Sequence, residues 1–393
     1  MVLTGVSMRT AVTSVGPVLT DLEHELHMQS GVAGVLTTLP VLSFAVIGTS
    51  ASRLVYRFGE HLLLIAAMAL MTLGLVARAL AGSVAVFLVF TVVALVGGAV
   101  SNVIMPSLVK RHFPYRIGPM TALYTTALSV GMTAAAAFSV PIGGLVAEPD
   151  QWRLALGCWA VLSGLAVLPW LPTLAGDRPE SSMAPRLPLA RLFRSPTAWA
   201  LTVLFGAQSF QAHISIGWFA TYLRDHGSSA TAAGLLVALY AGLSIPMSLA
   251  MPILAARRER RLILIACACY LVAYVGLAVA PAAGAWVWML LAGVGSGLFP
   301  LCLTMFGLHT RSAATTAALS AFAQGIGYLI AATGPLLVGV TLGSPHSWTG
   351  FFVLLFLALA ACVGCGLRAS KARFVDDEVD APAAVDAERS MQS

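Results

Sequence analysis

The sequence predicts an all-α membrane protein, with twelve transmembrane helices arranged in two six-helix pseudo-symmetric bundles. Composition, recurring apolar runs and an internal repeat lead to this prediction. Of the 393 residues, 59% are hydrophobic and 10% are charged, and the mean hydropathy is +0.89. A soluble domain carries about 25% charged residues, so this chain could not cover a water-facing surface. The composition excludes soluble enzymes, nucleic-acid-binding proteins and fibrous proteins.

Twelve apolar runs recur along the chain, and crossing a bilayer takes about 20 apolar residues of helix. They cover about residues 1–20, 31–51, 62–81, 84–106, 119–146, 152–171, 198–220, 232–254, 262–281, 286–308, 317–340 and 349–367. Because each run is continuously apolar, a β-barrel with alternating strands is disfavoured. No charged segment or cleavage pattern precedes the first run, so we expect no separate signal peptide. All six cysteines lie inside runs, where we expect buried free thiols.

The distribution of basic residues predicts the orientation of the chain in the membrane. Of the 22 Lys and Arg residues, 18 lie in gaps after even-numbered runs or in the C-terminal segment, and two lie in gaps after odd-numbered runs. Basic residues favour the cytoplasmic side of a membrane. We therefore expect a multi-pass protein of the cell (inner) membrane with both termini cytoplasmic. The net charge of +6 then reflects topology and not a nucleic-acid partner.

The gaps between runs divide the chain into four parts. The longest internal gap, residues 172–197, is rich in Pro, Arg and Ser and predicts a cytoplasmic linker. It separates an N-terminal six-helix bundle over residues 1–171 from a C-terminal six-helix bundle over residues 198–367. Residues 368–393 are rich in acidic residues and contain no apolar run, so we expect a disordered cytoplasmic tail there.

The two halves match each other at a near-constant offset, which indicates an internal repeat. Ala33-Gly34 matches Ala233-Gly234 and Arg57 matches Arg257 at an offset of 200, while Pro106 matches Pro300, Gly131 matches Gly325 and Pro141 matches Pro335 at an offset of 194. One six-residue deletion in the second half reconciles the two offsets. Six plus six helices in parallel repeat are typical of secondary transporters in which two halves move about a central site.

Several stretches resemble a known family. They are Met8-Arg9 with Thr13-Ser14-Val15-Gly16-Pro17, NVIMPSLVKRHFPYRIG from Asn102, LYTTALS from Leu123, GLFPLCLT from Gly297, and AFAQGIGYLIAATGP ending at Pro335. On these residues the chain resembles the major facilitator superfamily over its full length, and within it the cyanate-permease and 2-nitroimidazole-transporter family. It departs where that family usually has Asn-x-Arg-Pro, since residues 7–10 read Ser-Met-Arg-Thr. The resemblance implies that helices 1, 4, 7 and 10 line a cavity for a cyanate-like anion or a nitroimidazole-like heteroaromatic solute.

Arg9 is the strongest candidate for a functional residue. It lies near the middle of the first run, where a charge costs about 2.5–3.5 kcal/mol on insertion scales. None of the 16 acidic residues lies deep in a run, so we expect Arg9 to face a cavity and to bind a planar anion through its bidentate guanidinium. The other arginine inside a run, Arg78, lies three residues from the predicted outer end of its helix. Snorkelling to the lipid headgroups explains it.

Uncharged polar and aromatic residues complete the candidate set. The amides Asn102, Gln208, Gln211 and Gln324 lie in apolar runs and either bind solute or form interhelical hydrogen bonds, which average about 0.6 kcal/mol. Tyr124 and Trp218 either shape the pocket or pack at the lipid interface. The predicted substrate-binding residues are Arg9, Asn102, Tyr124, Gln208, Gln211, Trp218 and Gln324. His213 is the one histidine well inside a run and is a candidate for proton coupling, with a buried structural histidine as the alternative.

No motif for catalysis or for a cofactor stands out. The spacing of Gly293, Gly295 and Gly297 lacks the third glycine of a dinucleotide-binding loop and predicts close helix packing instead. We expect no catalytic residue, no enzyme activity, no cofactor and no metal. The expected partners are a small-molecule solute, the lipid bilayer and protons, with no nucleic acid, and the chain is expected to be a monomer. A secondary transporter fits best; a multidrug-type efflux carrier of the same fold and a transporter-like solute sensor remain alternatives.

Overall fold

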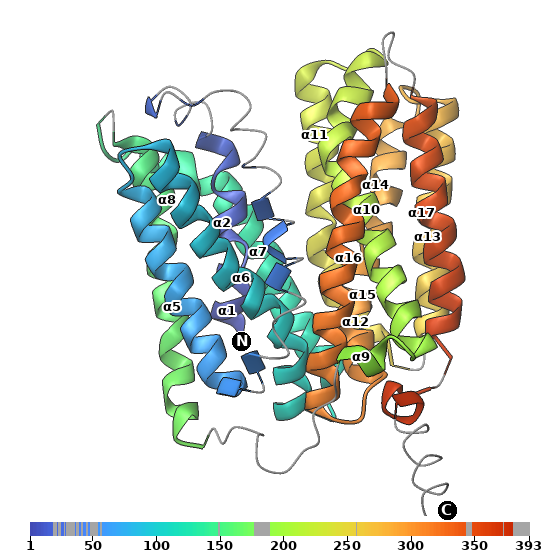
Figure 1. Ribbon diagram of the computed structural model, residues 1–393. Coiled ribbons are helices and arrows are strands. Elements are labelled where there is room, and N and C mark those ends of the chain that lie inside the picture. The colour runs from blue at the N-terminus through green and yellow to red at the C-terminus, as the bar shows by residue number, and fades with distance from the viewer. Residues whose placement is uncertain are drawn as a thin grey trace, which may run out of the picture. The chain divides into compact units, whose positions relative to one another are not determined.

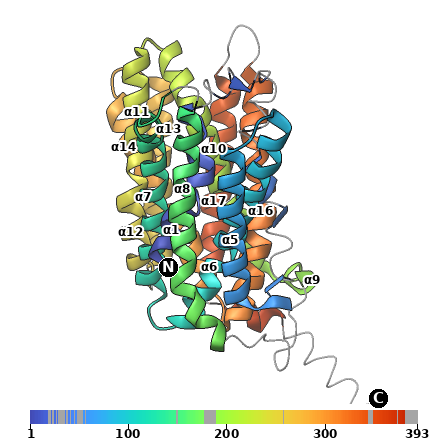
Figure 2. The same ribbon diagram turned by 90° about the vertical axis from the view of Figure 1, so that its left-hand side faces the viewer.

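The computed structural model describes a chain that folds into helices (Figures 1 and 2). The described residues are 1–18, 59–147, 150–176, 189–256, 258–342, 348–371 and 373–379, with single residues and short stretches between 22 and 58. The chain divides into two compact units. Unit 1 comprises Met1–Leu108 and Leu123–Arg186, and unit 2 comprises Val109–Ala122 and Leu187–Ser393. The change from one unit to the other after Arg186 falls within the stretch predicted as a linker.

Unit 1 contains the N-terminal helices. Its elements are α1 (Val2–Ser7), α2 (Thr10–Thr13), η1 (Gly16–Val18), α5 (Glu60–Ala79), α6 (Val84–His112), α7 (Ile117–Gly143), α8 (Gln151–Val167) and η2 (Leu168–Gly176). Helix α5 lies beside α8. Residues 109–122, which comprise the end of α6, the connection and the start of α7, belong to unit 2. There Gly118 lies against the Pro252 carbonyl, and the Lys110 ammonium donates to the Gly307 carbonyl at 3.1 Å.

Unit 2 contains the C-terminal helices. Its elements are α9 (Leu189–Leu192), α10 (Pro196–Asp225), α11 (Ala230–Gly242), α12 (Ser244–Leu254), α13 (Glu259–Val279), α14 (Ala285–Gly295), α15 (Leu298–Leu308), α16 (Ala313–Leu342) and α17 (Thr349–Ala369). Helix α10 packs on both α16 and α17, and α13 packs on α14 and α17. The long helix α10 begins sharply because Ser195 accepts a hydrogen bond from the Ala198 N–H and Pro196 occupies the first helical position.

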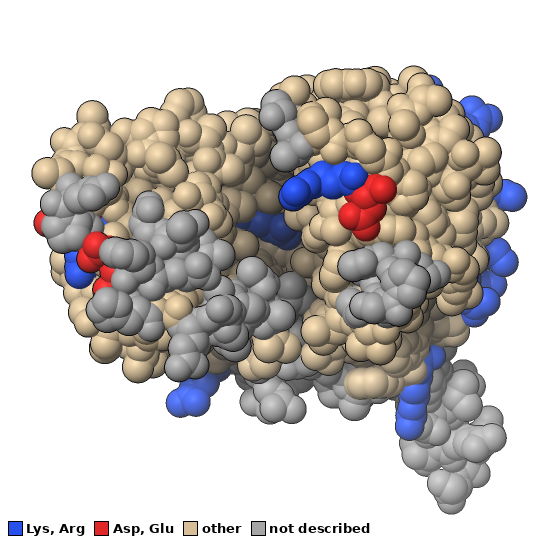
Figure 3. All heavy atoms as spheres, turned by 90° about the horizontal axis from the view of Figure 1, so that it is seen from above, with Lys and Arg blue, Asp and Glu red and all other residues tan. Residues whose placement is uncertain are grey.

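The predicted spans are confirmed for nine runs. Within the described residues, nine stretches are long and apolar enough to cross a membrane, and they match the third to sixth and the eighth to twelfth runs. The seventh run is covered by α10, a continuous helix of 30 residues. Most of the second run, residues 31–51, lies outside the described residues. Large apolar side chains such as Leu73, Val279 and Leu336 are exposed, and Figure 3 shows that uncharged residues make up most of the described surface visible from that side.

The first run differs from the single helix predicted over residues 1–20. Helix α1 ends at Ser7, the backbone turns at Met8 and Arg9, and α2 and η1 follow. Four hydroxyl side chains, those of Ser7, Thr10, Thr13 and Ser14, bond to backbone carbonyls three or four residues earlier. Such bonds compete with helix geometry and bend membrane helices, and Pro17 cannot donate a helical hydrogen bond. The run is therefore broken although its composition is apolar.

Two other expectations about small residues are confirmed. A Cβ atom on Gly293 would lie 2.6 Å from Leu243 Cδ1, and one on Gly297 would lie 2.8 Å from Met251 Cγ, so both glycines allow close helix packing. All six cysteines are free thiols that are buried or half-buried.

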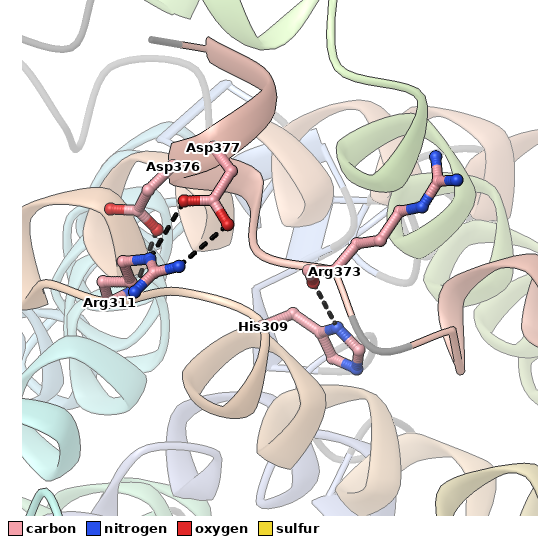
Figure 4. Close-up of polar contacts among 5 residues, drawn as sticks. All are labelled: His309, Arg311, Arg373, Asp376 and Asp377. Carbon is pink, nitrogen blue, oxygen red and sulfur yellow. Dashed lines mark hydrogen bonds and ion pairs between the residues drawn. The ribbon is translucent and has the colours of Figure 1, made fainter. Parts of the chain in front are cut away.

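Part of the C-terminal segment differs from the predicted disordered tail. Residues 373–379, here called the strap, pack against unit 2, with Val375 and Val379 buried. The Val375 N–H donates to the His309 carbonyl at 2.9 Å, and Arg311 binds Asp377 through Nε at 3.0 Å and Nη2 at 2.9 Å (Figure 4). The prediction of disorder is wrong for these residues because specific partners compensate their charges. Residues 380–393 lie outside the described part of the chain.

The strap also binds the start of α10. Ser195 and Thr197 donate their hydroxyl protons to the Glu378 carboxylate, and the Thr197 N–H donates to it at 3.0 Å. Burial raises the pKa of Glu378, but these hydrogen bonds outweigh burial and hold the pKa below its ordinary value. A carboxylate is stabilised at this position because a helix N-terminus carries unsatisfied N–H groups and a partial positive charge.

His309 connects the strap to α13. Its Nδ1 lies 3.0 Å from the Arg373 carbonyl (Figure 4), and its Nε2 lies 2.8 Å from Glu259 Oε2. Both partners accept hydrogen bonds, so the geometry fits the doubly protonated imidazolium. Burial alone would lower the pKa of His309, but the hydrogen bond and charge of Glu259, together with the Arg373 carbonyl, raise it above its ordinary value of 6.5.

We expect the His309 contacts to make stability depend on pH. Because the folded-state pKa is raised, the stabilisation is complete below about pH 6.5 and is lost as the pH rises through the folded-state value. His309→Gln should therefore lower the apparent melting temperature most below pH 6.5, and the difference from wild type should shrink at higher pH. His226→Gln, at the end of α10, is the control. An equal loss at every pH would show that protonation of His309 contributes nothing.

Candidate functional site

The break in the first span places Arg9 between two short helical segments. Arg9 lies at the N-terminus of α2 with φ −114° and ψ 2°, and its side chain is half-buried. Its carbonyl accepts from the N–H groups of Val12 and Thr13, each at 3.1 Å. Its guanidinium carbon lies 5.6 Å from the centre of the Phe44 ring, within the range of a cation–π interaction. A charged fork and an aromatic face thus lie together at the break.

Glycines bring two other helices against the backbone at the break. A Cβ atom on Gly98 of α6 would lie 2.7 Å from the Met8 carbonyl oxygen, and one on Gly131 of α7 would overlap the Val6 carbonyl. A Cβ atom on Gly5 would lie 2.7 Å from the Tyr124 carbonyl oxygen. Because small residues let helix backbones approach closely, α1 is held by backbone contact on two sides.

These contacts gather three of the predicted site residues in unit 1. Asn102 lies four residues after Gly98, one turn further along the same side of α6, and is buried. Tyr124 is buried and its backbone contacts Gly5, which lies one turn before Arg9. Arg9, Asn102 and Tyr124 therefore each lie at, or within about one helical turn of, a backbone contact made by Gly5 or Met8.

The corresponding crossing in unit 2 lies between α10 and α16. A Cβ atom on Gly206 would lie 3.2 Å from the Gly327 Cα. Gly206 stands 200 positions after Val6, so the crossing of the first and fifth spans in unit 1 recurs between the seventh and eleventh spans in unit 2. Gln208 and Gln324 are buried and lie within one turn of this crossing. Gln208 donates to the Ser209 hydroxyl and Gln324 to the Ser320 hydroxyl.

Gln211 has partners inside the bundle. Its Oε1 accepts from the Tyr274 hydroxyl at 3.0 Å, its Nε2 donates to Cys362 Sγ at 3.3 Å, and the side chain is fully buried. It thereby connects α10 to α13 and α17. Of the two predicted roles for Gln211, these contacts support interhelical hydrogen bonding.

Two predicted residues lie further along α10. His213 Nδ1 lies 2.7 Å from the Ser209 carbonyl, an interaction within one helical turn. Since the carbonyl only accepts, Nδ1 carries a proton. The Trp218 ring lies 6.5 Å from the Trp348 ring, in an aromatic group with Tyr222 and Phe351 at the end of α10. Trp218 is ten residues from Gln208, about 15 Å along the helix, and these contacts support a packing role.

A family profile described as Major Facilitator Superfamily matches residues 1–335. The chain belongs to the major facilitator superfamily. Among its relatives, a transporter named YycB from Bacillus subtilis (strain 168), described as uncharacterized, is 36% identical over 94% of this chain and 92% of its own length. The 2-nitroimidazole transporter of Escherichia coli (strain K12) is 32% identical over 91% and 92%, and the cyanate transport protein CynX of the same strain is 31% identical over 95% and 96%. The predicted resemblance is confirmed.

Solved structures agree on the fold. The proton:xylose symporter XylE, bound to 6-bromo-6-deoxy-D-glucose, has a TM-score of 0.77 at 13% identity, over 97% of both chains. FucP in the outward conformation has a TM-score of 0.68 at 15% identity, over 94% of this chain and 98% of that chain. The predicted fold class, the twelve-helix major facilitator fold, is confirmed. Like others of its superfamily, the protein is a membrane transporter.

The side chain of Arg78 lies inside the bundle and not, as predicted from the sequence, at the lipid headgroups. Arg78 is fully buried, and its guanidinium donates to the Ala11 carbonyl at 2.7 Å and to the Ser14 hydroxyl at 2.9 Å. Snorkelling to the headgroups is therefore wrong for this residue. Ser14 and Thr10 were not singled out in the sequence. The signal that could have found them is the cluster of four hydroxyl residues around Arg9.

We expect the close contact between Gly131 and Val6 to stabilise unit 1. In Gly131→Ala the added methyl group meets backbone, which cannot move aside as a side chain could, and such overpacking costs about 1–3 kcal/mol. The apparent melting temperature in detergent should fall. Gly364→Ala is the matched control, because a Cβ atom there meets nothing within 4 Å. Equal melting temperatures for the two variants would contradict the close packing.

Proposed function

We propose that the chain is a secondary active transporter that moves a small polar or anionic organic solute across the cytoplasmic membrane by alternating access. The observation that carries this proposal is Arg9, a half-buried guanidinium beside the Phe44 ring at a break in the first span. The named substrates of two relatives, cyanate and 2-nitroimidazole, suggest the class of solute. Both carry electronegative atoms that accept hydrogen bonds from N–H groups.

The chemistry of the site supports an anionic or electronegative solute. A guanidinium presents several donors in one plane, and an adjacent ring offers an apolar face to a flat solute. No acidic residue lies deep in an apolar run, so the charge of Arg9 favours a negative solute. We propose that Asn102 and Tyr124 complete the site in unit 1 and, separately, that the amides of Gln208 and Gln324 in unit 2 bind solute. Gln211 and Trp218 then stabilise the bundle.

The orientation proposed here follows from the basic residues. With 18 of 22 Lys and Arg on one side of the predicted membrane, both termini and the strap lie in the cytoplasm. The contacts of the strap agree with this arrangement, because it joins ends of helices that the charge pattern predicts on a single side.

We expect Arg9→Ala to lose uptake while remaining folded. Uptake of radiolabelled cyanate and of 2-nitroimidazole into proteoliposomes measures the effect. Removing a charge-assisted hydrogen bond should lower uptake at least about 10-fold, and Arg9→Lys should retain part of it because it keeps the charge but loses the planar fork. Arg224→Ala, an exposed arginine at the end of α10, is the control. Wild-type uptake by a destabilised Arg9→Ala would make Arg9 structural and would remove the main support for an anionic solute.

We propose that His213 carries the proton if a pH gradient drives accumulation. Gln in place of His213 can still donate to the Ser209 carbonyl but cannot take up a proton. His213→Gln should therefore abolish gradient-driven accumulation and leave exchange of internal for external solute intact. Both rates are measured in the same proteoliposomes, with His226→Gln as the control. Unchanged accumulation in His213→Gln would exclude this residue as the carrier.

A further inference from the structure

Arg78 is a charged side chain that the proposed transport cycle does not use. It lies in the last turn of α5 and is fully buried among apolar residues of unit 1. An intramembrane charge is unfavourable unless it has partners. The described partners of its guanidinium are the Ala11 carbonyl and the Ser14 hydroxyl, both in the broken first span.

The Ala11 carbonyl lies in the last turn of α2, where a helix leaves its final carbonyls without N–H partners. Water satisfies such groups in a soluble protein, but the hydrocarbon region offers none. Ala11 is itself buried in a core cluster with Met71, Leu75 and Trp159. The Nη1 group of Arg78 supplies the missing donor at 2.7 Å.

The second contact of Arg78 leads to both sides of the break. Its Nη2 donates to Ser14 Oγ, which donates to the Thr10 carbonyl at 2.6 Å. The Thr10 hydroxyl donates to the Ser7 carbonyl at 2.9 Å, at the end of α1. The chain of hydrogen bonds therefore runs from α5 across α2 to α1, and the residues that it spans include Arg9.

We propose that Arg78 is a positioning residue for the solute site: it fixes the broken segment of the first span and thereby sets where Arg9 stands. The proposal rests on the proposed function for the role of Arg9 in binding. A guanidinium presents the N–H donors of Nη1 and Nη2 in one plane, so a single side chain bonds to both acceptors at once, which a lysine ammonium cannot do with the same fixed geometry.

Unit 2 offers an internal comparison. Gln211 stands 200 positions after Ala11, and it too is held by a residue of the third helix of its half, the Tyr274 hydroxyl at 3.0 Å. There the span is the continuous helix α10, so the bond goes to a side chain and a neutral hydroxyl suffices. Where the span is broken and a backbone carbonyl needs a donor, the chain has an arginine instead.

The test uses full-length protein and a readout that needs no solute. Hydrogen exchange of the peptide amides at residues 8–14 should speed up about 10-fold or more in Arg78→Gln, less in Arg78→Lys, and to an intermediate degree in Ser14→Ala, which removes only the Nη2 contact. Tyr274→Phe is the matched control and should leave exchange at residues 8–14 unchanged. Wild-type exchange in both Arg78→Gln and Ser14→Ala would overturn the proposal. Should Arg78→Gln fail to fold, Ser14→Ala decides alone.

A transport measurement then distinguishes a positioning role of Arg78 from a role in stability alone. With 2-nitroimidazole as the probe, Arg78→Gln and Ser14→Ala should raise KM about 10-fold with a much smaller change in maximal rate per folded molecule, and Arg78→Lys should recover part of the affinity. Faster exchange with an unchanged KM would overturn the positioning role. If Arg9→Ala transports like wild type, the proposed function fails, and the exchange experiment still shows whether Arg78 holds the break.

Discussion

The hydrocarbon core of a bilayer supplies no hydrogen-bond partners, so a break in a membrane helix must be satisfied from within the chain. The break at Met8 and Arg9 shows how this chain meets that constraint. Hydroxyl groups of the same segment bond to several carbonyls, Arg78 reaches Ala11 from α5, and glycines let α6 and α7 press on the backbone. Each of these contacts requires space or a buried charge, which the neighbouring helices must accommodate. The packing of unit 1 is arranged around the break at which the guanidinium of Arg9 lies beside the Phe44 ring.

The first spans of the two units are related by the internal repeat, but they differ in chemistry. Unit 2 keeps its first span continuous and fills the matching region with neutral polar groups, in which Gln211 contacts Tyr274 and Cys362. In unit 1 the first span is broken, and two buried or half-buried arginines, Arg9 and Arg78, lie at the break. In the regions related by the repeat, unit 1 therefore carries a buried charge and unit 2 carries neutral polar groups.

The sequence predicts some features well because they are local. Twenty apolar residues in a row define a span wherever they occur, and nine spans follow directly. The break was missed because residues 1–20 are as apolar as an unbroken helix, and the broken form depends on Arg78, more than 60 residues away. The position of Arg78 along its apolar run could not show that its side chain points into the bundle and not toward lipid. The acidic composition of residues 373–379 is typical of disorder, and only their distant partners, such as Ser195 and Arg311, show otherwise. For Arg9, residue type and depth are the basis on which a site is predicted, whereas the role of Gln211 depends on neighbours that the sequence does not reveal.

The strap has a consequence for the order in which the protein is made. Residues 373–379 leave the ribosome after every helix that they join, yet Glu378 binds the first turn of α10, more than 180 residues earlier in the chain. The start of α10, the end of α15 and the start of α16 therefore lack their strap contacts until residues 373–379 have been made. A chain that stops short of Val375 carries all of its described spans but lacks the strap contacts on unit 2. Such a chain leaves the N-terminus of α10 without its carboxylate and Arg311 without Asp377.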